Sequence, residues 1–138
     1  MTRVVGIDLG SHRIGIAASD PGRILASPHS VLARGASHAA DHRHLADLVG
    51  ELEAGQVVVG LPRSLDGKEG LAARTVRAEI EELRAVLEVP VEAWDERLST
   101  VTANRGLQAR GVKAKAARKI IDQEAAAVIL QSWIDAHG

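Results

Sequence analysis

Acidic residues occur at three places in the sequence where a buried carboxylate would need a partner. Asp8 lies inside the run 4–10, whose other residues are apolar or glycine, and such a run predicts a strand that is covered on both faces. Asp95 and Glu96 stand together after another predicted strand, and Asp122 lies at the start of the last apolar segment. Because burying an isolated carboxylate is costly unless it is paired or binds a cation, each acid either has a structural role or belongs to a site.

The chemistry that these acids could perform together is metal-dependent hydrolysis. Three carboxylates that converge repel one another and demand cations, and an oxygen-only ligand set favours Mg²⁺ or Mn²⁺. Two such ions would activate a water molecule and stabilise the leaving oxygen in phosphodiester hydrolysis. The chain has no cysteine, which excludes a thiol nucleophile and a cysteine-based zinc site.

Each acid also has a structural explanation. Asp8 could cap the turn at Gly10, and Asp95 or Glu96 could stabilise the positive end of the helix that follows by about 0.3–1 kcal/mol. Asp122 could interact in the same way with the start of the last helix. The residues alone leave these alternatives open and do not decide between the two neighbouring acids.

A basic segment separates the second acidic position from the third. From Arg97 to Ile121 the chain has seven basic residues and no acidic one, whereas the remainder has 10 basic and 18 acidic residues. This asymmetry favours contact with a polyanion at one face of the protein, and a solvated helix face is the alternative. Such contacts would hold a nucleic-acid backbone without reading its sequence.

Further basic residues follow the first strand and lie in the loop 61–70, which is longer than a strand-to-helix connection requires. The predicted nucleic-acid contacts are Arg13, Arg63, Lys68, Arg97, Arg110, Lys113, Lys115, Arg118 and Lys119.

The elements that must position these residues form a single α/β domain over 1–138. Apolar patterns and turn residues predict strands at 4–10, 13–18, 24–32, 57–60 and 90–94, and helices at 37–53, 72–87, 99–109 and 120–136, with a connector at 110–119. The order predicts a mixed five-stranded sheet, with an antiparallel meander first, β–α units after it, and helices on its faces. The first and fourth strands should lie side by side, so that Asp8, the Asp95/Glu96 pair and the start of the last helix meet at one end. Pro28 places the third strand at a sheet edge.

The first predicted helix carries a weaker motif. His38 and His42 stand four residues apart in H-x-x-D-H, which differs from a metalloprotease pattern by having Asp41 in place of glutamate. The surrounding residues favour an exposed helix face, so this motif is a poor candidate for a metal site. On the second helix, Glu79, Glu81 and Glu82 are predicted to form a solvated outer face.

The motifs taken in order resemble the YqgF/RuvX family of RNase H-like proteins, which are regarded as Holliday junction resolvase-like proteins and as pre-16S rRNA nucleases. The resemblance extends over essentially the whole chain and rests on Gly-Ile-Asp-Leu-Gly at 6–10, Arg-Ile-Gly at 13–15, Val-Gly-Leu-Pro at 59–62 with Asp-Gly at 66–67, Asp-Glu-Arg-Leu-Ser-Thr at 95–100 and Ile-Asp-Gln-Glu-Ala-Ala at 121–126. It implies an RNase H-like fold. It also implies that Asp8, Glu96 and Asp122 are the metal-binding catalytic acids, and so selects Glu96 over Asp95.

The function that the resemblance and the residues imply is a metal-dependent endonuclease that processes the ends of precursor 16S rRNA in ribosome biogenesis. The alternatives are a Holliday junction resolvase and a non-catalytic nucleic-acid-binding factor. Sugar-kinase and actin-like ATPases open with the same motif, but they need two such domains. We expect a cytoplasmic protein, because no apolar run approaches the roughly 20 residues of a membrane span and the N-terminus lacks a signal-peptide pattern. We expect it to be a monomer or a homodimer.

Overall fold

The computed structural model describes residues 2–62, 69–98 and 115–137, and for residues 115–123 it describes the backbone alone. The predicted helix at 99–109 lies outside the described residues. No helix within the described ranges is both long enough and apolar enough to cross a membrane.

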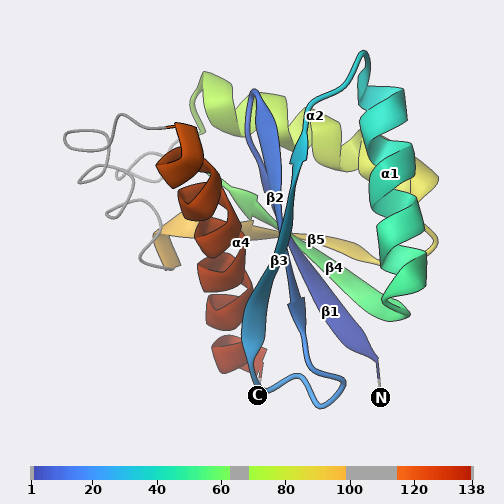
Figure 1. Cartoon of the computed structure of the whole chain (residues 1–138), viewed down its shortest axis with the longest axis vertical. Coiled ribbons are helices and arrows are strands. Elements are labelled where there is room, and N and C mark those ends of the chain that lie inside the picture. Colours follow the sequence, from blue (N-terminus) through green and yellow to red (C-terminus); the bar gives the residue numbers. More distant parts are fainter. Residues whose placement is uncertain (1, 63–68, 99–114, 138) are drawn as a thin grey trace.

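A five-stranded sheet with the order β3-β2-β1-β4-β5 forms the centre of the protein (Figure 1). The strands are β1 (Arg3–Leu9), β2 (Arg13–Ser19), β3 (Ala26–Ala33), β4 (Ala54–Leu61) and β5 (Val91–Asp95). The first three strands pair antiparallel, whereas β4 runs parallel to both β1 and β5. The predicted mixed sheet, the pairing of β1 with β4 and the place of β3 at an edge are therefore confirmed.

Helices cover both faces of this sheet. The helices α1 (His38–Glu51) and α2 (Leu71–Val86) lie on one face, and α4 (Lys115–His137) lies on the other (Figure 1). A short 3₁₀ helix, η1 (Glu96–Leu98), follows β5 directly. Figure 1 also shows that α4 runs antiparallel to β1, so that the start of α4 lies at the end of the sheet where β1 finishes.

The start of α4 differs from the prediction. The helix begins at Lys115, whereas 110–119 was predicted to be a connector, and that boundary was wrong by five residues. Alanine, lysine and arginine are among the strongest helix formers, so the stretch 115–119 extends the buried helix although it offers no apolar stripe of its own.

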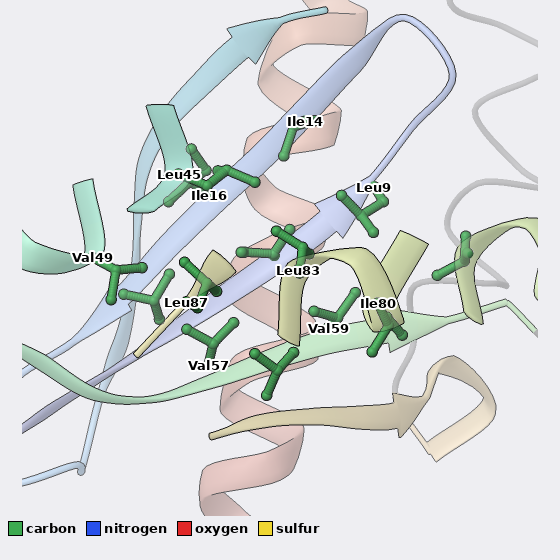
Figure 2. Close-up of a cluster of buried hydrophobic side chains, with 14 of the residues drawn as sticks. Leu9, Ile14, Ile16, Leu45, Val49, Val57, Val59, Ile80, Leu83 and Leu87 are labelled. Atoms are coloured by element: carbon green, nitrogen blue, oxygen red, sulfur yellow. The ribbon is translucent and has the colours of Figure 1, made fainter. Parts of the chain in front are cut away.

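Two apolar layers fix the sheet between the helices. In the first, Leu45 of α1 and Leu83 of α2 form one cluster with Ile16 of β2 and with Val57 and Val59 of β4 (Figure 2). In the second, α4 contributes a stripe that packs on Val4 and Val58; its members are Ala126, Ile129, Leu130, Trp133 and Ile134. The central strands are thus covered on both faces, as their apolar sequences predicted.

Candidate active site at the carboxyl end of the sheet

Asp8 is buried on the face of the sheet that α4 covers. Its side chain is 3% exposed. Val4 packs in the α4 layer, and a Cβ on Gly6 would lie 2.7 Å from the Cβ of Leu130 in α4. Because successive side chains of a strand alternate between faces, Asp8 lies on this same face, close to the end of β1.

Glu96 is equally buried, at 3% exposure, although it is the first residue after β5. Its side chain lies over Gly60 of β4. A Cβ on Gly60 would lie 3.1 Å from Glu96 Oε1, 3.2 Å from Glu96 Cγ and 2.5 Å from Ile129 Cδ1 of α4. Glu96 therefore lies on the α4 face, over the strand that separates β5 from β1.

The two acids are consequently brought to one face and one end of the sheet. Asp8 is near the end of β1, Gly60 near the end of β4, and Glu96 follows the end of β5, and these three strands are parallel. Gly60 matters because a side chain at this position would occupy the space into which Glu96 extends. This role of Gly60 was not predicted from the sequence, although an isolated glycine in a fully apolar strand signals a close approach of another group.

The third predicted acid, Asp122, belongs to α4. Ala126 lies over β1, since its carbonyl oxygen would be 3.0 Å from a Cβ on Gly6, and residue 122 precedes it by about one helical turn. Because α4 runs antiparallel to β1, the backbone at 122 lies farther along β1 than Gly6, toward Asp8. The side chain of Asp122 lies outside the described residues, so its participation stays a prediction.

Asp95, the neighbour of Glu96, has a different environment. Its carboxylate accepts hydrogen bonds from the side chain of Arg97, with Nη2 at 2.6 Å and Nε at 3.0 Å from Oδ2, and from the Arg97 backbone N–H at 2.9 Å. Asp95 thus caps the short helix η1 and fixes the turn from which Glu96 extends. This geometry gives Asp95 a structural role, which the sequence had left open.

Among the predicted nucleic-acid contacts, Arg13 and Arg97 have described side chains. Gly15 of β2 pairs with Asp8, and Arg13 stands two residues before Gly15. Arg13 therefore lies on the same face and at the same end of the sheet as Asp8. Arg97 is exposed beside Glu96. The others lie outside the described residues or, in α4, outside the described side chains; they are Arg63, Lys68, Arg110, Lys113, Lys115, Arg118 and Lys119. Their contacts with nucleic acid stay predictions.

A second group of charged side chains lies on the opposite face of the sheet. We call Arg34, Asp41, His42 and Glu79 the Arg34 cluster. Glu79 of α2 is 3% exposed and accepts hydrogen bonds from Arg34 at 2.6 and 2.8 Å, and its Oε2 lies 2.7 Å from His42 Nε2. The prediction that Glu79 is solvated was wrong. Asp41 and His42 are also buried, whereas His38, Arg43 and His44 of the same helix are exposed, as predicted for the surroundings of the motif.

The sequence contained a signal for this cluster. Glu79 stands three residues after Val76 and four before Leu83, and His42 stands three before Leu45, so both occupy the buried stripes of their helices. Glu81 and Glu82, which fall outside the stripe of α2, are exposed as predicted.

The Arg34 cluster touches the histidine motif of α1. Within the described parts of the chain, His38, His42 and Glu79 form the one group of three potential metal ligands whose ligand atoms lie within 4.8 Å of one another. Both Glu79 oxygens already accept from Arg34, and His38 Nδ1 lies 3.2 Å from Glu82. The group is therefore neutralised and hydrogen-bonded by protein groups without an ion.

The stability of the protein should fall with acid because of Glu79. Burial raises the pKa of this carboxyl. Hydrogen bonds from Arg34 and His42 and the charge of Arg34 lower the pKa by more than burial raises it, so it lies below its ordinary value of 4.5. Since the unfolded chain takes up the proton first, the stabilisation is complete above pH 4.5 and is lost as the pH falls through the folded pKa. Urea unfolding from pH 7 to pH 3 should show the advantage of the natural protein over Glu79→Gln shrinking below pH 4.5. A difference in unfolding free energy between the two proteins that stays constant over this range would contradict the lowered pKa of Glu79.

Two solved structures match this chain over almost its whole length. Thermus thermophilus RuvC in complex with a Holliday junction substrate matches with a TM-score of 0.59 and 15% identity, over 99% of this chain and 96% of that one. A second Thermus thermophilus RuvC structure matches with a TM-score of 0.57 and 16% identity over the same shares. The protein is therefore an α/β protein of the RNase H-like fold, as predicted.

The sequence comparison is more specific. The profile of the RuvX family, described as "Holliday junction resolvase", matches residues 2–136, and the chain belongs to this family. A relative from Mycobacterium sp. (strain KMS) is 51% identical over 134 residues, which cover 96% of this chain and 79% of that protein. A relative from Streptomyces avermitilis is 50% identical over 134 residues, which cover 96% and 85%. Both carry the name "Putative pre-16S rRNA nuclease". The family predicted from the motifs is thus confirmed.

Proposed function

We propose that this protein is a divalent-metal-dependent nuclease that hydrolyses phosphodiester bonds in structured nucleic acid, and that its substrate is precursor 16S rRNA in the cytoplasm. The observation that carries the proposal is the burial of two carboxylates, Asp8 and Glu96, on one face and at one end of the sheet, with Glu96 accommodated by Gly60. The names of the relatives support the choice of substrate, and the family description supports a nuclease.

The residues of this end of the sheet fit a hard divalent cation. Asp8 and Glu96 offer oxygen ligands only, and Mg²⁺ or Mn²⁺ prefer such ligands. We assign the binding of two such ions to Asp8, Glu96 and Asp122. When bound, the ions would supply an activated water and neutralise charge at the leaving oxygen.

The protein groups hold the acids and the substrate in place. Asp8 is fixed by the pairing of β1 with β2 and β4, and Glu96 by the Asp95–Arg97 contacts of η1. Arg13 and Arg97 lie beside these acids, where they can bind phosphates of the nucleic-acid backbone. Backbone contacts carry no base preference, so cleavage is directed by the shape of the folded RNA rather than by its sequence.

The test is a cleavage assay with two substrates, precursor 16S rRNA and a four-way DNA junction, each with Mg²⁺, with Mn²⁺ and with EDTA. We expect cleavage of the RNA that needs either metal, disappears in EDTA and returns when metal is added back. Cleavage that resists EDTA would contradict the metal dependence.

The same assay separates the alternatives. Paired cuts in the DNA junction without cleavage of the RNA would favour a resolvase, which needs two sites and hence a homodimer. Binding of both substrates without cleavage under any condition would favour a non-catalytic binding factor.

A further inference from the structure

The side chain of Arg34 connects the turn after β1 to the helices α1 and α2. It follows β3, and its Nε and Nη2 donate to the carbonyl oxygen of Gly10 at 3.0 and 2.9 Å. Nη2 and Nη1 also donate to the two carboxylate oxygens of Glu79, at 2.8 and 2.6 Å, and Nη1 lies 3.5 Å from Asp41 Oδ2. All three nitrogens of the guanidinium thus donate hydrogen bonds, four in total. Lysine has a single ammonium and cannot reproduce this planar set of contacts.

The acceptor Gly10 belongs to the turn 10–12 that joins β1 to β2. This turn begins two residues after Asp8 and ends just before Arg13. Besides its guanidinium contacts, Arg34 donates its backbone N–H to the carbonyl oxygen of His12 at 2.9 Å. Three hydrogen bonds from one residue therefore hold the turn that lies between an acid and a basic residue of the candidate active site.

The turn is also closed on itself. The N–H of Gly10 donates to the carbonyl oxygen of Arg13 at 2.9 Å, and a Cβ on Gly10 would lie only 2.5 Å from that oxygen. A displacement of the Gly10 carbonyl is therefore transmitted to Arg13 and, through the two intervening peptide units, to Asp8.

The other end of the guanidinium is anchored in the core. Glu79 on α2 and His42 on α1 are 3% and 2% exposed, and Asp41 accepts from the backbone N–H of Gly35 at 2.8 Å. Buried ion pairs are weak contributors to stability because desolvation offsets most of their attraction. Four hydrogen bonds to acceptors in the turn and on α2 do, however, hold the guanidinium in one position.

We propose that Arg34 is a positioning residue of the nuclease: held by Glu79, it fixes the turn 10–12 and thereby the placement of Asp8 and Arg13. This inference rests on the proposed function for its effect on cleavage, but not for its effect on the turn. Its matched control is Arg77, which pairs with Glu69 on the exposed side of α2 at 2.6 Å and makes no contact with the turn in the described structure.

The experiment compares Arg34→Lys with Arg77→Lys in the full chain. We expect Arg34→Lys to lower kcat about tenfold with KM for the RNA changed less than twofold, because a small displacement of reacting groups affects the transition state more than substrate binding. Hydrogen exchange, read by mass spectrometry on a peptide that covers 10–13, should become at least tenfold faster. Arg77→Lys should match the natural protein in both measurements.

The outcomes separate this inference from the proposed function. Arg34→Lys with a lower melting temperature but unchanged kcat and unchanged exchange at 10–13 would overturn the positioning role. If the natural protein cleaves nothing, the proposed function fails, and the exchange measurement still decides whether Arg34 fixes the turn. If Arg34→Lys does not fold, Glu79→Gln carries the same test, since it leaves the contacts to Gly10 possible and weakens their anchor; unchanged exchange in Glu79→Gln would then overturn the inference.

Discussion

Asp8→Asn is expected to lower the rate of precursor 16S rRNA cleavage about 1000-fold while the protein stays folded and still binds the RNA. Asparagine has nearly the shape of aspartate, so the packing between β1 and α4 should survive. It lacks the negative charge that a divalent cation requires, and the loss of about 4 kcal/mol of transition-state stabilisation corresponds to about a 1000-fold lower rate. Single-turnover cleavage with saturating enzyme measures the rate, and a melting curve with an RNA-binding isotherm in EDTA checks fold and binding.

The control for Asp8→Asn is Asp47→Asn, which makes the same chemical change at an exposed position of α1 on the other face of the sheet. It should cleave as the natural protein does. Asp122→Asn tests the third predicted ligand, and we expect a loss of the same size. Cleavage by Asp8→Asn within tenfold of the natural rate would remove Asp8 from the catalytic site.

Much of the fold could be predicted because its determinants are local in the sequence. The runs around Val5 and Val58 are apolar on both faces, which identifies central strands, and Pro28 identifies an edge strand. Once β1 and β4 are neighbours and parallel to β5, Asp8 and Glu96 must lie toward the same end of the sheet. These positions follow from periodicity and connection rules without any contact information.

The parts that could not be predicted depend on pairs of residues far apart in the chain. Glu79 is buried because Arg34, 45 residues earlier, reaches it after β3 ends, and nothing near either residue in the sequence marks that pairing. Periodicity places Glu79 on the buried stripe of α2, but it does not identify the distant residue that balances its charge. The burial of Glu79 is therefore a tertiary effect, and only the structure reveals that the cluster continues to the turn after Asp8.

Gly60 is a similar case, and it shows what allows Glu96 to extend over β4. β4 separates β1 from β5, so an ordinary side chain on the α4 face of β4 would stand between Asp8 and Glu96. The missing side chain leaves that space to the Glu96 carboxylate, which approaches the Cβ position to 3.1 Å, and to Ile129 of α4. The glycine is thus required by what crosses over it rather than by its own backbone conformation.

Gly60→Ala should consequently lower kcat about 100-fold, because the new methyl group displaces Glu96, and a displacement of about 1 Å can cost that factor. The methyl would also meet Ile129 Cδ1 at 2.5 Å, and overpacking should lower the free energy of unfolding by about 1–3 kcal/mol. The double variant Gly60→Ala with Ile129→Val separates the two effects, since valine lacks Cδ1. We expect it to regain most of the stability, measured by urea unfolding, while cleavage stays near the low rate of Gly60→Ala. Recovery of cleavage together with stability would show that strain against α4, and not the displacement of Glu96, causes the loss.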